Sequence, residues 1–357
     1  MKVLVIALSG IGDALMFTPA LAKLREDKPD AIIDALVMFR GVEEFYSSLP
    51  GINKVHFIDF LKGNPLISFF TLLKFFKRYD ATINVYPSNR KEYNIISFLI
   101  GAKKRIGAEY LHMDKKELGF LNNVRVKESA ETHNVVTNIK LVEKFTGISS
   151  DTYFPLNFPL TDESKRNAEE FFENSKISKN DLVIGFHPGC NTLKNHINRR
   201  WSPDKFANLG KKLIGEKNAK ILLFGGPDEE SLKNHIAKII DLQNVFSVST
   251  SSLTASAAVM KRCKLFVTND SGNMHIAAAL KLPVVAIIGP TNPNFIYPWQ
   301  TKHEIATLNL HCSPCFFYSP KPLTCSRQLE PFKCVRDLNV ELVLKHINTL
   351  LNESYSS

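Results

Sequence analysis

The segment S-G-I-G-D at residues 9–13 places two glycines beside a carboxylate. Asp13 could take a proton as a general base, or it could simply cap a helix that begins there. A dinucleotide-binding fingerprint would need a third glycine at the position of Leu15, and it is absent. Asp13 would also repel a phosphate at the helix N-terminus, although the helix dipole favours a carboxylate there. The spacing therefore predicts a loop that presents a carboxylate rather than one that binds pyrophosphate.

A second loop, D-S-G-N-M-H at residues 270–275, lies between an apolar strand and the helical run I-A-A-A-L. Its backbone amides and the Ser271 hydroxyl could receive an anion, and Gly272 permits close approach of a backbone or ligand. Asp270 suits sugar hydroxyls better than phosphate. His275 lies one helical turn after Ser271, on the same side. A purely structural turn is the alternative.

Two further strand ends carry charged residues. Arg199 and Arg200 precede a helix in N-R-R-W-S-P, and arginine offers the bidentate donors that suit a diphosphate. Glu229 follows a strand in F-G-G-P-D-E-E and could hold a ribose or sugar hydroxyl. The alternatives are a solvated basic loop and acidic residues that merely complement a helix dipole.

Four cysteines gather late in the chain, at Cys312, Cys315, Cys325 and Cys334. A C-x-x-C pair followed by two more cysteines is a weak candidate for a metal site, because eight residues separate the second pair. Buried or free thiols and a disulfide are the alternatives. There is no D-x-D pair to hold a divalent cation.

Alternating strands and helices must position these loops. Apolar runs predict strands at 3–8, 32–37, 54–57 and 81–85, then at 182–186, 221–224, 265–267 and 284–288. Helices are expected near 64–78, 91–100, 163–174, 203–215, 228–240, 254–261 and 272–281. The polar, proline-containing stretch 149–159 is a plausible linker. Two successive βα arrays predict two doubly wound α/β domains, with ligands at the carboxyl ends of the strands.

Composition narrows the possible partners. The chain has 357 residues, a net charge of +10 and no uninterrupted apolar run of membrane-spanning length. The positive surplus favours an anionic partner such as nucleic acid, a membrane surface or a phosphorylated substrate. Gly10, Gly12 and Asp13 interrupt what would otherwise resemble a signal peptide, so we expect a cytoplasmic protein with reduced thiols.

The run 66–78 is apolar with a basic end. Such a helix can lie on an anionic bilayer, or it can be an internal packing helix of the first domain. Lys103, Lys104 and Arg105 could help to engage an acidic acceptor.

Taken together, these segments resemble glycosyltransferase family 9, the bacterial ADP-heptose:lipopolysaccharide heptosyltransferases. The resemblance extends from S-G-I-G-D-A-L-M-F-T-P-A-L through K-R-Y-D-A-T-I-N-V, G-A-K-K-R-I-G-A, R-R-W-S-P-D-K-F and F-G-G-P-D-E-E to D-S-G-N-M-H-I-A-A-A-L and I-I-G-P-T-N-P. It implies a GT-B fold, in which two Rossmann-like doubly wound domains face a central cleft. The corresponding ranges are 1–160 for the acceptor, 161–340 for the nucleotide sugar, and 341–357 for a C-terminal helix and tail.

The resemblance also implies an inverting, metal-independent transfer of heptose, with no cofactor, from ADP-heptose to an anionic lipopolysaccharide precursor at the cytoplasmic face of the inner membrane. It makes Asp13 the general base and Ser9, Gly10 and Gly12 the acceptor-side loop. On the donor side it gives the diphosphate to Arg199, Arg200, Ser271 and Gly272, and the nucleotide and sugar to Glu229, Asp270 and His275. Arg199 stands where many members have lysine, which keeps the charge but changes its geometry.

Three alternatives remain at this stage. A member of the same family could use another nucleotide sugar or a different acceptor. A nicotinamide-dependent oxidoreductase is weakened by the missing third glycine. A nucleic-acid-binding protein lacks a supporting basic-aromatic or helix-turn-helix pattern, so we expect no nucleic acid partner.

Overall fold

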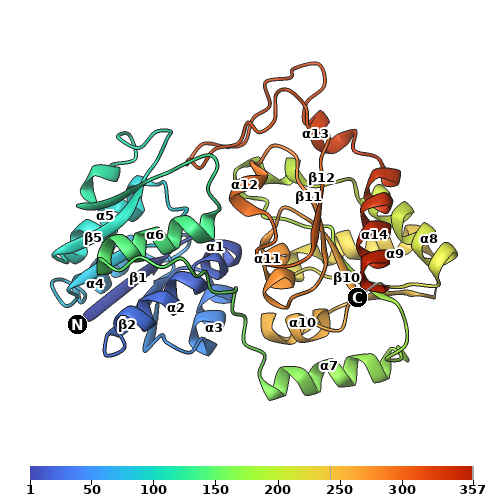
Figure 1. Ribbon diagram of the computed structural model, residues 1–357, viewed down its shortest axis with the longest axis horizontal. Coiled ribbons are helices and arrows are strands. Elements are labelled where there is room, and N and C mark those ends of the chain that lie inside the picture. The colour runs from blue at the N-terminus through green and yellow to red at the C-terminus, as the bar shows by residue number, and fades with distance from the viewer. Residues whose placement is uncertain (242, 356–357) are drawn as a thin grey trace. The chain divides into compact units, whose positions relative to one another are not determined.

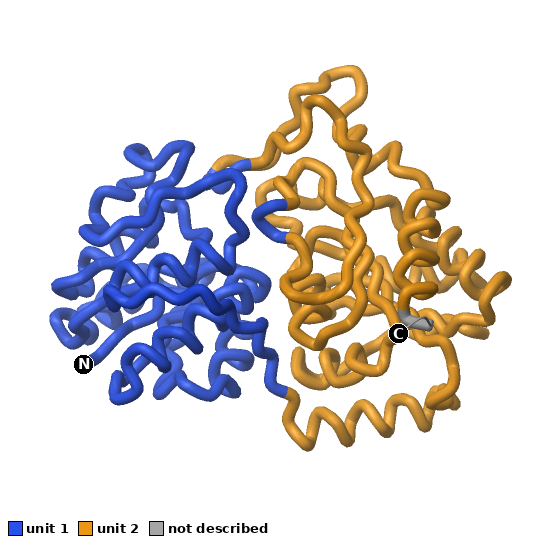
Figure 2. The backbone as a smooth tube through the Cα atoms, viewed as in Figure 1, with its two compact units in different colours: residues 1–159, 294–296, 317–320 blue, residues 160–293, 297–316, 321–357 orange. Residues whose placement is uncertain are grey.

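The computed structural model describes residues 1–241 and 243–355, which form two compact units (Figure 2). Unit 1 comprises Met1–Pro159 with the short segments Asn294–Ile296 and Phe317–Pro320. Unit 2 comprises Leu160–Pro293, Tyr297–Phe316 and Lys321–Ser357. These two short segments come from the second half of the chain but belong to unit 1. A single boundary at residue 160 would assign them to unit 2.

Unit 1 is built on a six-stranded sheet in which every strand pair is parallel. The strand order is β3-β2-β1-β4-β5-β6, with β1 at Lys2–Ala7, β2 at Ile32–Val37, β3 at Lys54–Phe57, β4 at Ala81–Asn84, β5 at Lys104–Glu109 and β6 at Val124–Lys127. β1 lies near the centre of the sheet. Its residues from Val3 onward are all buried, as expected for a strand that is covered on both faces.

Helices connect these parallel strands (Figure 1). They are α1 at Ile11–Met16, α2 at Thr18–Asp27, α3 at Arg40–Ser48, α4 at Pro65–Leu73, α5 at Lys91–Ile100 and α6 at Asn134–Thr146, with a 3₁₀ turn, η1, at Gly119–Leu121. Gly101 ends α5 and Gly147 ends α6 in the left-handed conformation (φ 70° and 78°), where glycine avoids a Cβ clash.

Unit 2 repeats the same topology. Its parallel strands run β12-β11-β10-β7-β8-β9, with β7 at Val183–His187, β8 at Lys220–Leu223, β9 at Val245–Ser247, β10 at Leu265–Asn269, β11 at Val284–Ile287 and β12 at His303–Ala306. Read from the opposite edge, this order places the unit's first and fourth strands side by side at the centre, as in unit 1. Each sheet therefore reverses its order once, and such a point is where α/β proteins bind ligands.

The connections of unit 2 include several short turns. Its helices are α7 at Asp162–Asn174, α8 at Pro203–Lys217, α9 at Glu230–Ile240, α10 at Leu253–Met260, α11 at Gly272–Ala279, α12 at Pro293–Ile296, α13 at Lys333–Arg336 and α14 at Val340–Tyr355, and its 3₁₀ segments are η2 at Leu193–Arg199 and η3 at Pro227–Glu229. α12 begins in unit 2 and continues into unit 1. Within the described residues, each helix is too short or too polar to cross a bilayer.

Buried Trp201 fixes the loop that follows η2. Its backbone N–H donates to Asn269 Oδ1 (2.9 Å), and its indole N–H donates to the carbonyl of Leu338 (2.8 Å). Asn269 in turn donates to the carbonyl of Pro188 (2.7 Å). One side chain at the end of β10 therefore holds together the loops after β7 and η2.

The predicted fold class, α/β with two Rossmann-like doubly wound domains, is confirmed, and all eight predicted strands exist. Four strands were missed: β5, β6, β9 and β12. Their sequences, KRIGAE, VRVK, VFS and HEIA, are short or charged and lack the apolar runs of the central strands. Their burial is correspondingly incomplete, because they lie toward the edges of the sheets.

Candidate active site

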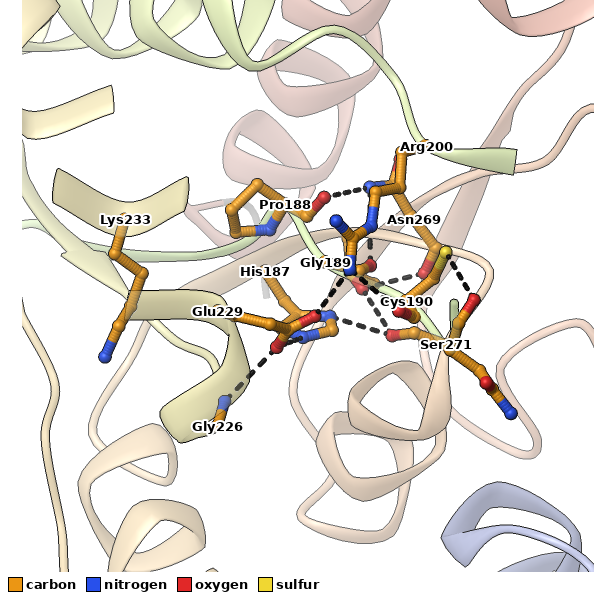
Figure 3. A network of polar contacts seen from close by, with 12 residues as sticks. His187, Pro188, Gly189, Cys190, Arg200, Gly226, Glu229, Lys233, Asn269 and Ser271 are labelled. Atoms are coloured by element: carbon orange, nitrogen blue, oxygen red, sulfur yellow. Dashed lines mark hydrogen bonds and ion pairs between the residues drawn. The ribbon is translucent and has the colours of Figure 1, made fainter. Parts of the chain in front are cut away.

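Polar side chains of unit 2 meet where β7, β8 and β10 end (Figure 3). His187, the last residue of β7, lies at the centre of this group. Its Nδ1 is 2.9 Å from Ser271 Oγ, and its Nε2 is 3.2 Å from Glu229 Oε2. The imidazole thus joins two loops that are 42 and 84 residues away in the sequence.

Glu229 is fixed as a carboxylate. Its Oε1 accepts from Arg200 (3.2 Å), and its Oε2 accepts from the Gly226 amide (3.2 Å). Burial raises the pKa of Glu229, but the hydrogen bond and charge of His187, the Gly226 amide and Arg200 together bring it below its usual value. The carboxylate packs closely against Gly189, where a Cβ would lie 1.7 Å from Oε1.

Arg199 forms the second ion pair of this site. Its Nη1 is 2.7 Å from Asp270 Oδ2, and both side chains are about nine-tenths buried. Thr291 donates to the same carboxylate oxygen at 2.6 Å. The guanidinium also lies 5.6 Å from the centre of the Phe316 ring. Two adjacent arginines are therefore each held by a different carboxylate.

Several nitrogen atoms of this cluster still lack a partner. The Nε atoms of Arg199 and Arg200, Nε2 of His196 and Nδ1 of His275 are buried, and no described group hydrogen-bonds to them. Buried polar atoms normally have a hydrogen-bond partner. Buried nitrogen atoms without one therefore need an explanation, and a bound ligand would supply it. The arginine donors suit an acceptor-rich anion.

His196 and His275 are neutral at physiological pH. Burial, with the charge of Arg199, lowers the pKa of His196 to about 4. Burial lowers the pKa of His275 to about 4, and the charge of Asp270 opposes this shift without cancelling it. His275 can therefore offer a ligand a hydrogen bond but no positive charge.

α11 begins at Gly272, where the sequence predicted a helix over 272–281. Ser271 is the N-cap residue, but its hydroxyl makes no capping hydrogen bond in the described chain. It lies instead 2.9 Å from His187 and 3.2 Å from Thr268 Oγ1. The first-turn amides, beginning at Gly272, are therefore not capped by this side chain. Helix N-termini of this kind favour anions.

In unit 1 the S-G-I-G-D loop follows β1, at the point where that sheet reverses its order. Gly10 is the N-cap residue of α1, and Asp13 lies in the first helical turn. The alternative that Asp13 is itself the N-cap is wrong. The pKa of Tyr46 is raised above its usual value, mainly by burial and in smaller part by the negative charge of Asp13.

Gly10 itself is not required by the fold. It has φ −69° and ψ 176°, which any residue can adopt, and a Cβ there would meet no described heavy atom within 4 Å. Ser9 donates to the carbonyl of Pro87 (2.7 Å), which ties the loop to the segment after β4. The space beside Gly10 is thus open to a ligand.

A buried polar network in unit 1 was not predicted. Tyr318 accepts from Asn134 Nδ2 at its hydroxyl (2.8 Å) and from Asn89 Nδ2 at its carbonyl (2.8 Å). The side-chain Oδ1 atoms of both asparagines are buried, and no described group donates to them. The tyrosine comes from the second half of the chain, so no local pattern could reveal this cluster.

The four late cysteines line one small pocket with Pro290, Arg327 and Lys333. All are free thiols, and their proximity contributes to raising the pKa of Cys334, chiefly a burial effect, to about 11. Among residues 1–241 and 243–355, no three His, Cys, Asp or Glu side chains are arranged to hold a metal ion. The thiols are thus gathered in one place.

Replacing Gly189 by alanine should displace Glu229, because the new Cβ would overlap its carboxylate. The lost charge-assisted hydrogen bonds predict a destabilisation of about 1–3 kcal/mol, measured as a lower thermal midpoint. Gly215→Ala is the matched control: its Cβ would meet no heavy atom within 4 Å, and it lies within α8. There alanine should stabilise by about 0.5–1 kcal/mol. Equal midpoints for the two variants would contradict the described packing of Glu229.

The buried His275 should make stability fall in mild acid. Its folded pKa of about 4 lies below the usual 6.5, so between these values the unfolded chain binds more protons. The free energy of unfolding should therefore decrease as the pH falls from 6.5 toward 4, by at most about 1.4 kcal/mol per pH unit for this group. Urea unfolding at pH 7 and pH 5 should show a smaller loss for His275→Gln than for wild type.

The control for this experiment is His235→Gln. His235 is an exposed residue that is paired with Asp204. Its replacement should leave the acid sensitivity of buried His275 in place. If His275→Gln loses as much stability as wild type, then protonation of His275 does not explain the effect.

Comparisons with known proteins bear on this geometry. Residues 75–323 match Glycosyltransferase family 9 (heptosyltransferase). The lipooligosaccharide heptosyltransferase 2 of Campylobacter jejuni is 27% identical, over 99% of this chain and 100% of that protein. Two solved structures share the fold. The family 9 glycosyltransferase of Veillonella parvula has a TM-score of 0.75 at 22% identity, covering 99% and 97% of the two chains. ADP-heptose lps heptosyltransferase II of Escherichia coli has a TM-score of 0.72 at 23% identity, covering 99% and 100%.

The family match spans more than half of the chain and includes the loops that carry Arg199, Glu229 and Asp270. The expected enzyme class is therefore confirmed, and the chain belongs to glycosyltransferase family 9.

Proposed function

We propose that this glycosyltransferase moves a heptose from ADP-heptose to the inner core of a lipopolysaccharide precursor. The named relatives support this choice, since they are heptosyltransferases of lipooligosaccharide or lipopolysaccharide. The observation that carries the proposal is the pair Arg199 and Arg200, whose buried Nε donors have no partner in the described chain. Those donors lie in the unit whose α11 N-terminus also favours an anion.

On the donor side, the diphosphate would accept hydrogen bonds from Arg199 and Arg200, from Ser271 and from the amides beginning at Gly272. A diphosphate carries negative charge, as do the two carboxylates that now hold the arginines. Binding would therefore share or replace existing ion pairs rather than neutralise free cations. The arginines would also stabilise the charge that develops on the leaving group, so we expect no metal requirement.

Three other side chains complete the proposed donor site. Glu229, a carboxylate in the described network, would accept from ribose hydroxyls. Asp270 would accept from the sugar, and neutral His275 would contribute a hydrogen bond rather than a charge. The range 161–340 would thus serve the nucleotide sugar, with 341–357 forming a C-terminal helix and tail.

On the acceptor side, Asp13 would act as general base. It would take the proton from an acceptor hydroxyl as that oxygen bonds to the anomeric carbon. The bond from this carbon to the diphosphate breaks, its electron pair leaves with ADP, and the sugar configuration inverts. Ser9, Gly10 and Gly12 would border the acceptor, with the open space at Gly10 as the supporting observation. The range 1–160 would bind the acceptor at the cytoplasmic face of a membrane.

Nucleotide binding tests the donor. Thermal unfolding in ADP, UDP, GDP and NAD should show a shift with ADP alone, because a ligand at a hundred times its dissociation constant adds about 2.7 kcal/mol. Arg199→Gln should reduce the shift, whereas Arg327→Gln, an exposed residue paired with Glu330, should not. A shift with only UDP or GDP would reassign the sugar donor. NAD as the sole stabiliser would overturn the transferase proposal.

Asp13→Asn tests the base. The amide keeps the size of the side chain but cannot accept the proton, so turnover should fall about 10²–10⁴-fold. ADP should stabilise the variant as much as wild type, because Asp13 belongs to a different unit from the donor residues. Glu43→Gln, another carboxyl in a first helical turn of unit 1, should retain turnover. Wild-type turnover by Asp13→Asn would rule out this general base.

A further inference from the structure

α4 exposes an apolar surface that the rest of the structure does not cover. Within its nine residues, all of which are described, Leu72 is the one buried side chain. Leu66, Ile67 and Phe70 are 68%, 66% and 62% exposed. Leu72 and Phe75 join the buried core of unit 1, so the run packs on the domain through these two side chains and leaves its other large apolar side chains exposed. A helix that exposes this much apolar surface to solvent is unusual unless the surface is a binding site.

α5 continues this surface. Ile95, Phe98 and Leu99 are exposed along one side of the helix, while its other side is buried. The two helices are tied together at their carboxyl ends: Lys77 N–H donates to the Ile100 carbonyl (2.8 Å), and the exposed Phe76 ring packs over Gly101. The apolar side chains of α4 and α5 thus form one docking surface, comprising Leu66, Ile67, Phe69, Phe70, Leu73, Phe76, Ile95, Phe98 and Leu99.

Basic residues border this docking surface. The segment from 60 to 79 contains Lys62, Lys74, Lys77 and Arg78 but no aspartate or glutamate. All four are exposed, as are Lys91, Lys103 and Lys104 nearby, against two exposed acidic residues, Asp80 and Glu92. The Arg105 guanidinium lies 5.4 Å from the centre of the Phe98 ring, so positive charge reaches the apolar face itself.

We propose that α4 and α5 dock the protein onto an anionic lipid bilayer. Apolar side chains would enter the boundary between headgroups and acyl chains, and the surrounding lysines would meet lipid phosphates. Charge decides between this occupant and a second copy of the chain. A symmetric dimer would bring two copies of the same basic rim together, and like charges would oppose it.

The docking surface has a topological relation to the proposed acceptor loop. α4 follows β3 and α5 follows β4, and these strands are parallel to β1. Both helices therefore begin at the sheet edge where the loop 9–13 follows β1. The inference extends the proposed function, on which its account of a lipid-borne acceptor rests. Membrane binding itself can be measured without any turnover.

Vesicle flotation is the test. The full chain should float with vesicles containing phosphatidylglycerol but only weakly with phosphatidylcholine alone, and added salt should release it. Ile67→Ser with Phe70→Ser should lower the bound fraction roughly tenfold or more. Lys74→Glu with Lys77→Glu should abolish the preference for anionic lipid. Leu329→Ser, an apolar residue 98% exposed in unit 2, is the matched control and should float like wild type.

Several outcomes would overturn the proposal. Wild type could fail to float with phosphatidylglycerol at low salt, or the Ile67/Phe70 variant could float as well as wild type. The docking surface would instead join two copies if the wild type is a dimer, the variant is a monomer and neither floats. Because all these positions are exposed, the variants should keep the wild-type thermal midpoint. The stabilisation by ADP should also persist, which separates failure of this inference from failure of the proposed function.

Discussion

The pairing of two adjacent buried arginines with two carboxylates is the constraint on which the candidate donor site depends. Neighbouring guanidinium groups repel each other, and burying a charge is costly unless it is paired. Asp270 meets this need for Arg199, and Glu229 does so for Arg200. Each carboxylate is anchored in turn, by Thr291 on one side and by His187 with the Gly226 amide on the other. The arginines are thus positioned before any anion arrives, and less ordering remains to be done on binding.

The central strands could be predicted from sequence because they are buried on both faces and read as apolar runs. Peripheral strands such as Val124–Lys127 alternate charged and apolar residues and are only partly buried, so they carry no such run. Sequence also singled out Asp13, Arg199, Glu229 and Asp270, each in a segment that follows a strand. It did not identify His187, which directly follows the predicted strand 182–186, because the contacts that give this imidazole a role come from residues far away in the chain. The Asn89–Tyr318 contact was out of reach for the same reason.

The two units share one strand order but present opposite chemistry at the point where that order reverses. In unit 1 the loop after the first strand leads to a carboxylate in the first turn of α1. In unit 2 the corresponding position holds His187, and the helix after the fourth strand begins with Ser271 and Gly272. The fold supplies an equivalent edge in both units, and a few loop residues decide which side chains are presented there: a carboxylate in unit 1, and a histidine with an uncapped helix N-terminus in unit 2. No internal sequence repeat reveals this relation, because the topology depends on apolar periodicity rather than on residue identity.

The unusual feature of unit 1 is the position of its apolar surface. Helices that follow parallel strands normally cover the sheet and bury most of one face, as α6 does with eight buried residues. α4 buries one residue of nine, so packing against the sheet does not explain its composition. An exposed phenylalanine or leucine does not stabilise the protein in water more than a polar residue would. At a bilayer, the transfer of its apolar side chain out of water contributes favourable free energy of binding. The basic residues around this surface contribute nothing to packing, but they would be attracted to anionic lipid headgroups. Composition, exposure and charge at α4 and α5 therefore all agree with the proposal that this side of unit 1 meets a lipid surface.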